Sequence, residues 1–336
     1  MKVLVMGGSR FNGFYLVQEL VRQGHEVTVF NRGLTPTDFP PEVRRRYGDR
    51  KDHQQLPEVL GREEFDCIQD ISAYTLDDVQ SMVELFEGRA GHYIFASSTV
   101  VYAASKVLPL AEDFPVELGP LQQDYGRNKI LCEQYLIGRY RERHFPVTIA
   151  RFSMVLGPRN IIAEREQMMF VRLLRGRKIL VPGDGTTLGQ VGHVEDEARA
   201  LRMMMLNPRA YGQIYNVTGN QYFTDDGYVD TIAAVVGVAP QKVYVPAPVM
   251  DELYPLGVSR LERPLIQRLA PYIHGWKAPV VFSIQKLRDH LGFAPAYTFA
   301  SGMRQTYEWF QQEGLADRLE FDFRFEDELL ARLGGE

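Results

Sequence analysis

Cysteine is nearly absent from this chain, with only Cys67 and Cys132 among 336 residues. Two cysteines exclude both a disulfide framework and a zinc cluster built on several thiolates. The histidines show no metal-ligand spacing, so no metal site is predicted. This cysteine usage favours a reducing, cytoplasmic location.

Long apolar runs are missing as well. The first apolar stretch, residues 3–6, ends at Gly7 and Gly8 and is too short for the core of a signal peptide. No run approaches the ~18 apolar residues that a membrane span needs. We therefore expect a soluble intracellular protein without a membrane partner.

The chain also lacks a basic excess. It carries 38 Lys and Arg against 43 Asp and Glu, a formal net charge of −5. A domain built to hold nucleic acid usually shows a surplus of positive charge, so a nucleic-acid partner is disfavoured. The arginine run 44–46 alternates out of an expected strand, and solvation explains it more simply than binding. The expected partner is a small molecule.

The composition is that of an ordinary globular protein, with 45% hydrophobic residues. The length allows about two domains of ~150 residues each. Apolar runs at 3–6, 26–31, 43–47, 65–70, 92–96 and 147–151 predict strands. Helical periodicity between them is clearest at 11–22, 76–86 and 122–143. This alternation predicts an α/β fold: a Rossmann-type, doubly wound parallel sheet with helices on both faces.

After residue 152 the elements become shorter and mixed. Helical patterns occur at 167–175, 195–206, 284–291, 301–312 and 322–333, and short strands at 179–181 and 214–217. We expect a dinucleotide-binding domain at 1–155 with parts of 190–225. A smaller, mixed α/β substrate domain would comprise 156–189 and 226–320, and a C-terminal helix would lie within 321–336.

A glycine-rich turn, residues 7–13, separates the first strand from the first helix. Glycines there permit close backbone approach, and the helix N-terminus offers free N–H groups to a pyrophosphate. The expected cofactor contacts come from this turn: Gly7, Ser9, Arg10, Phe11, Asn12 and Gly13. A turn with a structural role only is the alternative.

The second strand ends at Asn31, followed by Arg32. A carboxylate there would accept bonds from the adenosine ribose of NAD and repel the extra phosphate of NADP. Asn31 removes that repulsion, and Arg32 can contact a 2′-phosphate. The cofactor is therefore NADP or NAD with a slight preference for NADP, and a merely solvated Arg32 is the alternative.

Tyr125 and Lys129 lie four residues apart at the start of a long helix, on one face of it. A nearby ammonium favours the phenolate, so Lys129 is expected to lower the pKa of Tyr125. Tyr125 can then exchange a proton with a carbinol or carbonyl oxygen. Ser97 and Ser98 end an upstream strand, where a hydroxyl can hold a substrate oxygen or simply cap the next segment.

Together, these residues resemble the extended short-chain dehydrogenase/reductase superfamily, in its NAD(P)-dependent sugar epimerase/dehydratase group. The segments 151–158, 182–185 and 193–196 resemble later landmarks of that group. The resemblance implies catalytic roles for Ser98, Tyr125 and Lys129, with Lys129 also holding the nicotinamide ribose. It implies adenine-side contacts from Asp49 and Arg50, substrate contacts from Ser98, Thr99 and Asn160, and a homodimer formed through helices 76–87 and 122–143.

The chain also departs from that pattern. Arg10 replaces the middle glycine of the turn, and this Gly-Gly-x-Arg-Phe form resembles a branch that includes chloroplast stem-loop RNA-binding proteins and bacterial relatives. Thr99 and Val100 stand where dehydratases and decarboxylases of the group place carboxylates, so those two activities are disfavoured. Gly189 replaces an arginine that clamps a diphosphate. A second clamp arginine near 273 is missing, with Arg260, Arg263 and Lys277 as candidate substitutes.

The expected function is NAD(P)-dependent sugar epimerisation, with a nucleotide sugar as substrate and a transient keto intermediate formed by hydride transfer. An NADPH-dependent ketone or keto-sugar reductase is an alternative that uses the same residues. A non-catalytic RNA-binding protein on the same scaffold is the other alternative.

Overall fold

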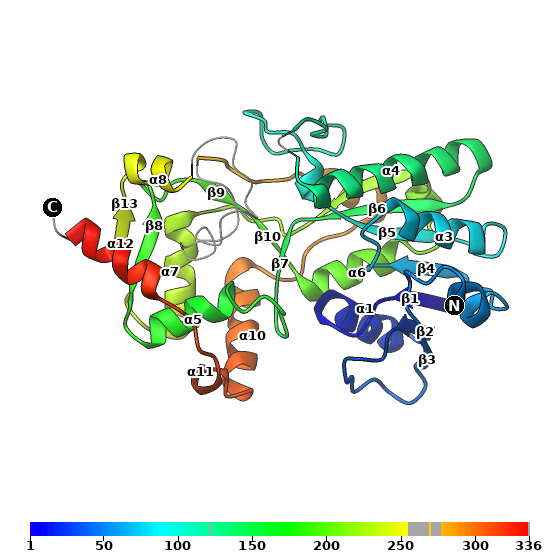
Figure 1. Ribbon diagram of the computed structural model, residues 1–336, viewed down its shortest axis with the longest axis horizontal. Helices are drawn as coiled ribbons and strands as arrows, with labels where there is room; N and C mark the ends of the chain where they lie inside the picture. Colours follow the sequence, from blue (N-terminus) through cyan, green and yellow to red (C-terminus); the bar gives the residue numbers. More distant parts are fainter. Residues whose placement is uncertain (121, 255–268, 270–276, 335–336) are drawn as a thin grey trace. The chain divides into compact units, whose positions relative to one another are not determined.

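The computed structural model describes the chain except for residues 121, 255–268, 270–276 and 335–336 (Figure 1). It divides into two compact units. Unit 1 comprises Met1–Ser153, Val194–Thr218 and Ser283–Pro295, and unit 2 comprises Met154–His193, Gly219–Phe282 and Ala296–Glu336. None of the helices in the described ranges is both long enough and apolar enough to cross a membrane.

Unit 1 is built on a parallel sheet. Its described strands are β1 (Lys2–Met6), β2 (Glu26–Asn31), β3 (Arg44–Tyr47), β4 (Cys67–Asp70), β5 (Tyr93–Ser98), β6 (Val147–Phe152) and β11 (Gln213–Val217). Their order in space is β11-β6-β5-β4-β1-β2-β3, and every neighbouring pair is parallel. The order reverses beside β1, which places the switch point of the sheet between β1 and β4.

Helices cover both faces of this sheet. They are α1 (Phe11–Arg22), α2 (Gln55–Leu60), α3 (Leu76–Phe86), α4 (Asp124–Arg143), α6 (Val194–Met204) and α9 (Gln285–Leu291), with short 3-10 turns η1 (Thr99–Val101) and η2 (Pro208–Ala210). α1 packs against α6, and α3 packs against α4 (Figure 1). The predicted Rossmann-type doubly wound fold is confirmed.

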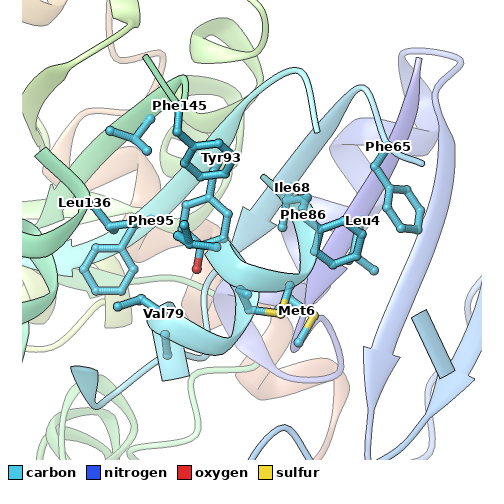
Figure 2. Close-up of a cluster of buried hydrophobic side chains, with 14 of the residues drawn as sticks. Leu4, Met6, Phe65, Ile68, Val79, Phe86, Tyr93, Phe95, Leu136 and Phe145 are labelled. Atoms are coloured by element: carbon cyan, nitrogen blue, oxygen red, sulfur yellow. The ribbon is translucent and has the colours of Figure 1, made fainter. Parts of the chain in front are cut away.

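Strand periodicity explains the core on the α3/α4 side. Leu4 and Met6 alternate along β1 and point to the same face, where they belong to one buried cluster with Phe86 of α3 and Leu136 of α4; Leu4 lies near Phe86, and Leu136 lies near Phe95 of β5 (Figure 2). α3 begins where Thr75 and Asp78 form a capping box, each side chain bonded to the other's backbone N–H. Residues 71–75 join the carboxyl end of β4 to this helix.

Unit 2 is a smaller mixed α/β body. Its described strands form three pairs: β7 (Met154–Leu156) with β10 (Val191–His193), β8 (Lys178–Pro182) with β13 (Gln241–Val245), and β9 (Leu188–Gly189) with β12 (Phe223–Thr224). Its helices are α5 (Glu166–Leu174), α7 (Asp225–Val236), α8 (Ala247–Leu253), α10 (Phe299–Gln312), α11 (Leu315–Arg318) and α12 (Arg324–Gly334). Aromatic rings of α5 and α10 meet in its core, with the centroids of Phe170 and Phe310 5.2 Å apart.

Two parts of the chain belong to a different unit from the one that the predicted domain boundaries assign to them. Residues 283–295 belong to unit 1, because Lys286 of α9 bonds the Ile214 carbonyl at 3.0 Å and Ser283 N bonds the Leu110 carbonyl at 2.8 Å. The C-terminal helix α12 is part of unit 2, because Glu326 pairs with Arg172 of α5.

Candidate functional site

The glycine turn between β1 and α1 has a backbone that other residues could not adopt. Gly7 and Gly8 have φ of 110° and 85°, in the region that side chains disfavour. A Cβ on Gly13 would lie 2.6 Å from the Gly8 Cα, so α1 starts in direct backbone contact with the turn. The α1 N-terminus has no side-chain cap, and the N–H groups of Gly13 and Phe14 donate to the Arg10 carbonyl at 2.9 and 3.2 Å. This cradle fits a dinucleotide pyrophosphate.

Asn31 ties the turn to the end of β2. Its amide nitrogen donates to Ser9 Oγ at 2.7 Å, and its amide oxygen accepts from Gly33 N at 2.8 Å. A neutral amide therefore stands at the position where a carboxylate would select NAD. Arg32, directly after it, is exposed.

Three predicted residues of the turn have different environments. Arg10 is exposed, and its Nε donates to Thr35 Oγ1 at 3.2 Å. Phe11 is buried, and the Asn12 amide donates to Glu197 Oε2 at 3.2 Å. Only Arg10 of these three presents its side chain to solvent beside the turn.

A hollow opens beyond the ends of β2 and β3, still within unit 1. Its lining residues are Val29, Asn31, Gly33, Leu34, Thr35, Pro36, Thr37, Phe39, Arg45 and Tyr47. The Arg45 guanidinium lies 5.7 Å from the Phe39 ring centroid and donates to the Thr37 carbonyl at 2.9 Å. Among these lining residues there is one guanidinium and no carboxylate. Arg44 and Arg45 are exposed, as expected for a partly solvated run, and the sequence did not predict that Arg45 lines this hollow.

Arg50 has carboxylate partners that the sequence did not predict. Its guanidinium is largely buried and pairs with Asp70 at 2.7 and 3.0 Å and with Asp78 at 3.3 Å. The cofactor contact expected from Arg50 stays a prediction. Asp49 remains exposed, which is compatible with its predicted adenine-side role.

The predicted catalytic residues do come together at the carboxyl end of β5. Lys129 is 3% exposed, and its Nζ donates to the Ala73 and Ala96 carbonyls at 2.8 and 2.6 Å. Nζ also lies 5.6 Å from the Tyr125 ring centroid. Ser98 is close enough to the Tyr125 hydroxyl to lower the pKa of that phenol. A phenol, a serine hydroxyl and an ammonium thus share one edge of the sheet.

The electrostatics of Tyr125 differ from the expectation. Burial raises its pKa to about 12, the nearby Tyr74 phenol adds to the rise, and the proximity of Ser98 opposes it. Burial lowers the pKa of Lys129 to about 8. The expectation that Lys129 lowers the pKa of Tyr125 is wrong here, because the Lys129 ammonium is directed at two backbone carbonyls. At neutral pH Tyr125 is a phenol, the form that donates a proton.

A buried ion pair stabilises the carboxyl end of β5, and the sequence did not predict it. Glu133 of α4 accepts from the Ser97 hydroxyl, and its carboxylate pairs with Arg151 of β6 at 2.6 Å. Arg151 also lies 4.7 Å from the Tyr102 ring centroid. The Ser97 hydroxyl is therefore bonded to Glu133 and is not free to hold a substrate oxygen, although Ser97 is next to Ser98. The only local signal was that Glu133 follows Lys129 at helical spacing.

The other predicted substrate residues are less accessible. Thr99 is 8% exposed and lies in η1. Asn160 is 5% exposed, and its amide donates to both oxygens of Glu166 at 3.2 and 2.9 Å. Its side-chain oxygen accepts from Ile162 N at 3.0 Å. Both ends of the Asn160 amide thus have partners within the protein, and the expected substrate contact stays a prediction. Burial raises the pKa of Glu166 to about 7.

Gly189, at the first expected clamp position, lies in β9. Of the candidate substitutes, Lys277 is exposed and pairs with Asp251 at 2.8 Å. Arg260 and Arg263 lie outside the described residues. Over the described ranges, no three His, Cys, Asp or Glu side chains are grouped as metal ligands.

Comparison with known proteins agrees with this geometry. Residues 3–218 match the model of the NAD dependent epimerase/dehydratase family. The chain belongs to this family. Its members are enzymes of the extended short-chain dehydrogenase/reductase type and depend on NAD or NADP. The predictions of the family and of an enzyme of this type are confirmed.

The individual proteins that this chain resembles have names that describe different activities. The chain is 29% identical to the chloroplast stem-loop binding protein of 41 kDa b from Arabidopsis thaliana, over 98% of this chain and 84% of that protein. It superposes with a TM-score of 0.75 on dTDP-glucose 4,6-dehydratase of Bacillus anthracis in complex with NAD, at 19% identity over 94% and 98% of the two chains. UDP-glucose 4-epimerase of Thermotoga maritima with UDP-glucose gives the same TM-score at 20% identity, over 93% and 99%. These two solved structures show a shared fold.

Proposed function

We propose that this enzyme epimerises a nucleotide-linked sugar through a transient keto intermediate, with NADP as its cofactor. The observation that carries the proposal is the meeting of Ser98, Tyr125 and Lys129 at the carboxyl end of β5, in the same unit as the glycine cradle. A site that only bound a ligand would have no need of a phenol, an ammonium and a serine in this arrangement.

The residues divide the work as follows. The glycine cradle would hold the pyrophosphate, and Lys129 would hold the nicotinamide ribose. A bound nicotinamide would supply the acceptor, and later the donor, of a hydride. Ser98 would hold the substrate oxygen beside Tyr125. Tyr125 as phenolate would take the proton of that hydroxyl when the carbinol is oxidised, and would return it to the oxygen when the ketone is reduced on its other face. Atoms and electrons balance over the cycle.

We prefer epimerisation to dehydration or decarboxylation because the residues of η1 include no carboxylate. Thr99 and Val100 occupy the places where a carboxylate would protonate a departing hydroxyl or assist loss of a carboxyl group. Neither side chain can do this at neutral pH. The relatives named above include both epimerases and dehydratases, so this segment separates the two activities in our proposal.

NADP is preferred to NAD because of the end of β2. Asn31 offers no negative charge there, Arg32 is exposed, and Arg45 lines the adjoining hollow. A 2′-phosphate would gain charge-assisted hydrogen bonds from these guanidinium groups.

A ketone reductase that consumes NADPH is a second candidate, which one observation favours. With a pKa of about 12, Tyr125 is a proton donor at neutral pH, and reduction of a ketone starts with such a donor. Epimerisation must instead begin from the minor phenolate form. Homodimerisation through α3 and α4 and a cytoplasmic location stay predictions.

The experiment that tests this proposal makes two measurements. Purified protein is denatured and any released nicotinamide nucleotide is identified by mass. The native protein is then incubated with UDP-glucose or dTDP-glucose and NADP⁺, and the sugar is followed by NMR. We expect stoichiometric NADP and conversion of one sugar to its epimer without net change of cofactor. An empty protein that consumes NADPH with a keto-sugar would establish the reductase, and a protein that neither carries nor binds a nicotinamide nucleotide would refute both.

Tyr125→Phe is the matched variant, because it removes one hydroxyl and keeps the ring. Turnover should fall by about 10³-fold or more, since the proton then has no carrier. The dissociation constant for NADP⁺ should stay within about twofold. Undiminished turnover would remove Tyr125 from the mechanism.

A further inference from the structure

Tyr74 is a second tyrosine at this site, and nothing in the mechanism above uses it. It follows β4 and is 57% exposed. Its ring centroid lies 5.8 Å from that of Tyr125, with the two planes inclined at 49°. Lys129 Nζ lies 5.3 Å from the Tyr74 centroid and 5.6 Å from the Tyr125 centroid. The two phenols are therefore neighbours over one buried ammonium.

The backbone that carries Tyr74 is held rigidly. Tyr74 N donates to Asp78 Oδ2 at 2.8 Å, and Asp78 is paired with buried Arg50 at 3.3 Å. On the other side, the Ala73 carbonyl accepts from Lys129 at 2.8 Å. The ring is thus presented to solvent from a fixed base, so placing a ligand on it requires little ordering of the chain.

The Tyr74 ring lies outside the hydrophobic core of unit 1. Tyr93 and Phe95, in the adjoining β5, are fully buried in the core on the α3/α4 side. Tyr74 is not part of that core. Small-molecule sites are lined by aromatic faces with a few polar groups that set orientation, and Tyr74, Tyr125 and Ser98 provide this combination.

We propose that the Tyr74 ring packs against the apolar C–H face of the substrate's hexose, beside Tyr125, and so determines affinity and selectivity for the sugar. This inference rests on the proposed function. A substrate oxygen bound at Ser98 and Tyr125 brings its sugar ring within reach of an aromatic face 5.8 Å from Tyr125. The contact is one of packing, so the ring of Tyr74 is needed and its hydroxyl is not.

The test compares three variants on whichever of UDP-glucose and dTDP-glucose the unaltered enzyme converts. Tyr74→Ala removes the ring, Tyr74→Phe keeps the ring without the hydroxyl, and Tyr222→Ala removes a tyrosine of unit 2 that is 50% exposed. We measure KM and kcat for the sugar and the dissociation constant for NADP⁺ by fluorescence.

We expect Tyr74→Ala to raise KM by about tenfold while kcat changes by less than about threefold and NADP⁺ affinity is kept, which is the signature of lost substrate binding. Tyr74→Phe and Tyr222→Ala should stay within about twofold of the unaltered enzyme. A structural role for Tyr74 would instead weaken cofactor and sugar together.

The other outcomes contradict the inference in distinguishable ways. An unchanged KM in Tyr74→Ala, or an equal loss in Tyr74→Phe, overturns the role of the Tyr74 ring and leaves the proposed function intact. If the unaltered enzyme converts neither sugar, the proposed function fails and the role of Tyr74 fails with it.

Discussion

At the end of β2, a neutral amide and an exposed guanidinium stand where a carboxylate would select NAD. The sequence already predicts this pair, because it follows directly from the residue types at 31 and 32. The structure adds that the Asn31 side chain is occupied with Ser9 and Gly33. In the proposed binding of NADP, Arg32 is therefore the group at the end of β2 that would discriminate between the two dinucleotides, with Arg45 in the adjoining hollow.

Arg32→Ala should weaken NADP⁺ by about 10- to 100-fold, the value of one charge-assisted contact of ~1.5–3 kcal/mol, while NAD⁺ binding changes little. Arg44→Ala is the matched control, because Arg44 is exposed on β3 and pairs with Glu26 at 3.6 Å. Calorimetric titration with both cofactors measures the difference. Equal losses for NADP⁺ and NAD⁺ would refute the assignment of a 2′-phosphate to Arg32.

Residue identity and spacing predict which groups form the site, but not their ionisation or their partners. Tyr125 and Lys129 are predicted from a spacing of four, yet the pKa of Tyr125 moves opposite to the expectation because burial dominates. Arg50 and Asn160 have the right residue types for a ligand contact and bond to Asp70 and Glu166 within the protein. Burial and pairing depend on segments that are distant in sequence.

At the scale of the element, periodic patterns predict most helices and strands well, and the failures have local causes. α2 was missed because it is six residues long and contains Pro57. α7 was missed although Thr224 caps it and Tyr228, Val229 and Ile232 recur at helical spacing. α12 was predicted as an amphipathic helix, but its attachment to α5 was not.

A buried ion pair attaches α12 to α5, and we expect unit 2 to become less stable when one partner is removed. Arg172 and Glu326 are 3% and 1% exposed, and their side chains pair at 2.6 Å. Arg172→Met leaves a buried carboxylate without its partner and should lower the free energy of unfolding of unit 2 by ~3–5 kcal/mol.

The fluorescence of Trp309, which packs against the core of unit 2, reports this unfolding in urea. The matched control is Arg172→Met with Glu326→Leu, which removes both charges. The double variant should recover most of the loss, since the desolvation cost disappears together with the attraction. A double variant as unstable as the single one would show that packing, and not charge, joins α12 to α5.

At the scale of the whole molecule, the cofactor cradle and the catalytic edge belong to unit 1. Cofactor binding should therefore stabilise unit 1. NADP⁺ at about 100 times its dissociation constant should add ~2.7 kcal/mol to the free energy of unfolding of that unit.

Hydrogen exchange of β1 and β5 peptides measures this gain. Gly13→Ala should abolish it, because the new Cβ would lie 2.6 Å from the Gly8 Cα. Gly138→Ala is the control, since nothing lies within 4 Å of a Cβ built at that position in α4. A gain that survives in Gly13→Ala would place the cofactor elsewhere.

The α/β alternation, the glycine turn and the residue types proposed as catalytic can be read from the sequence alone, because periodicity, φ preferences and short spacings are local properties of a chain. The folded chain is needed to see that Arg50 is occupied by carboxylates, that Glu133 and Arg151 support Ser97, and that Tyr74 lies beside Tyr125. Ion pairing, burial and ring contacts arise when folding brings together segments that are far apart in the chain, and no local pattern specifies which segments meet.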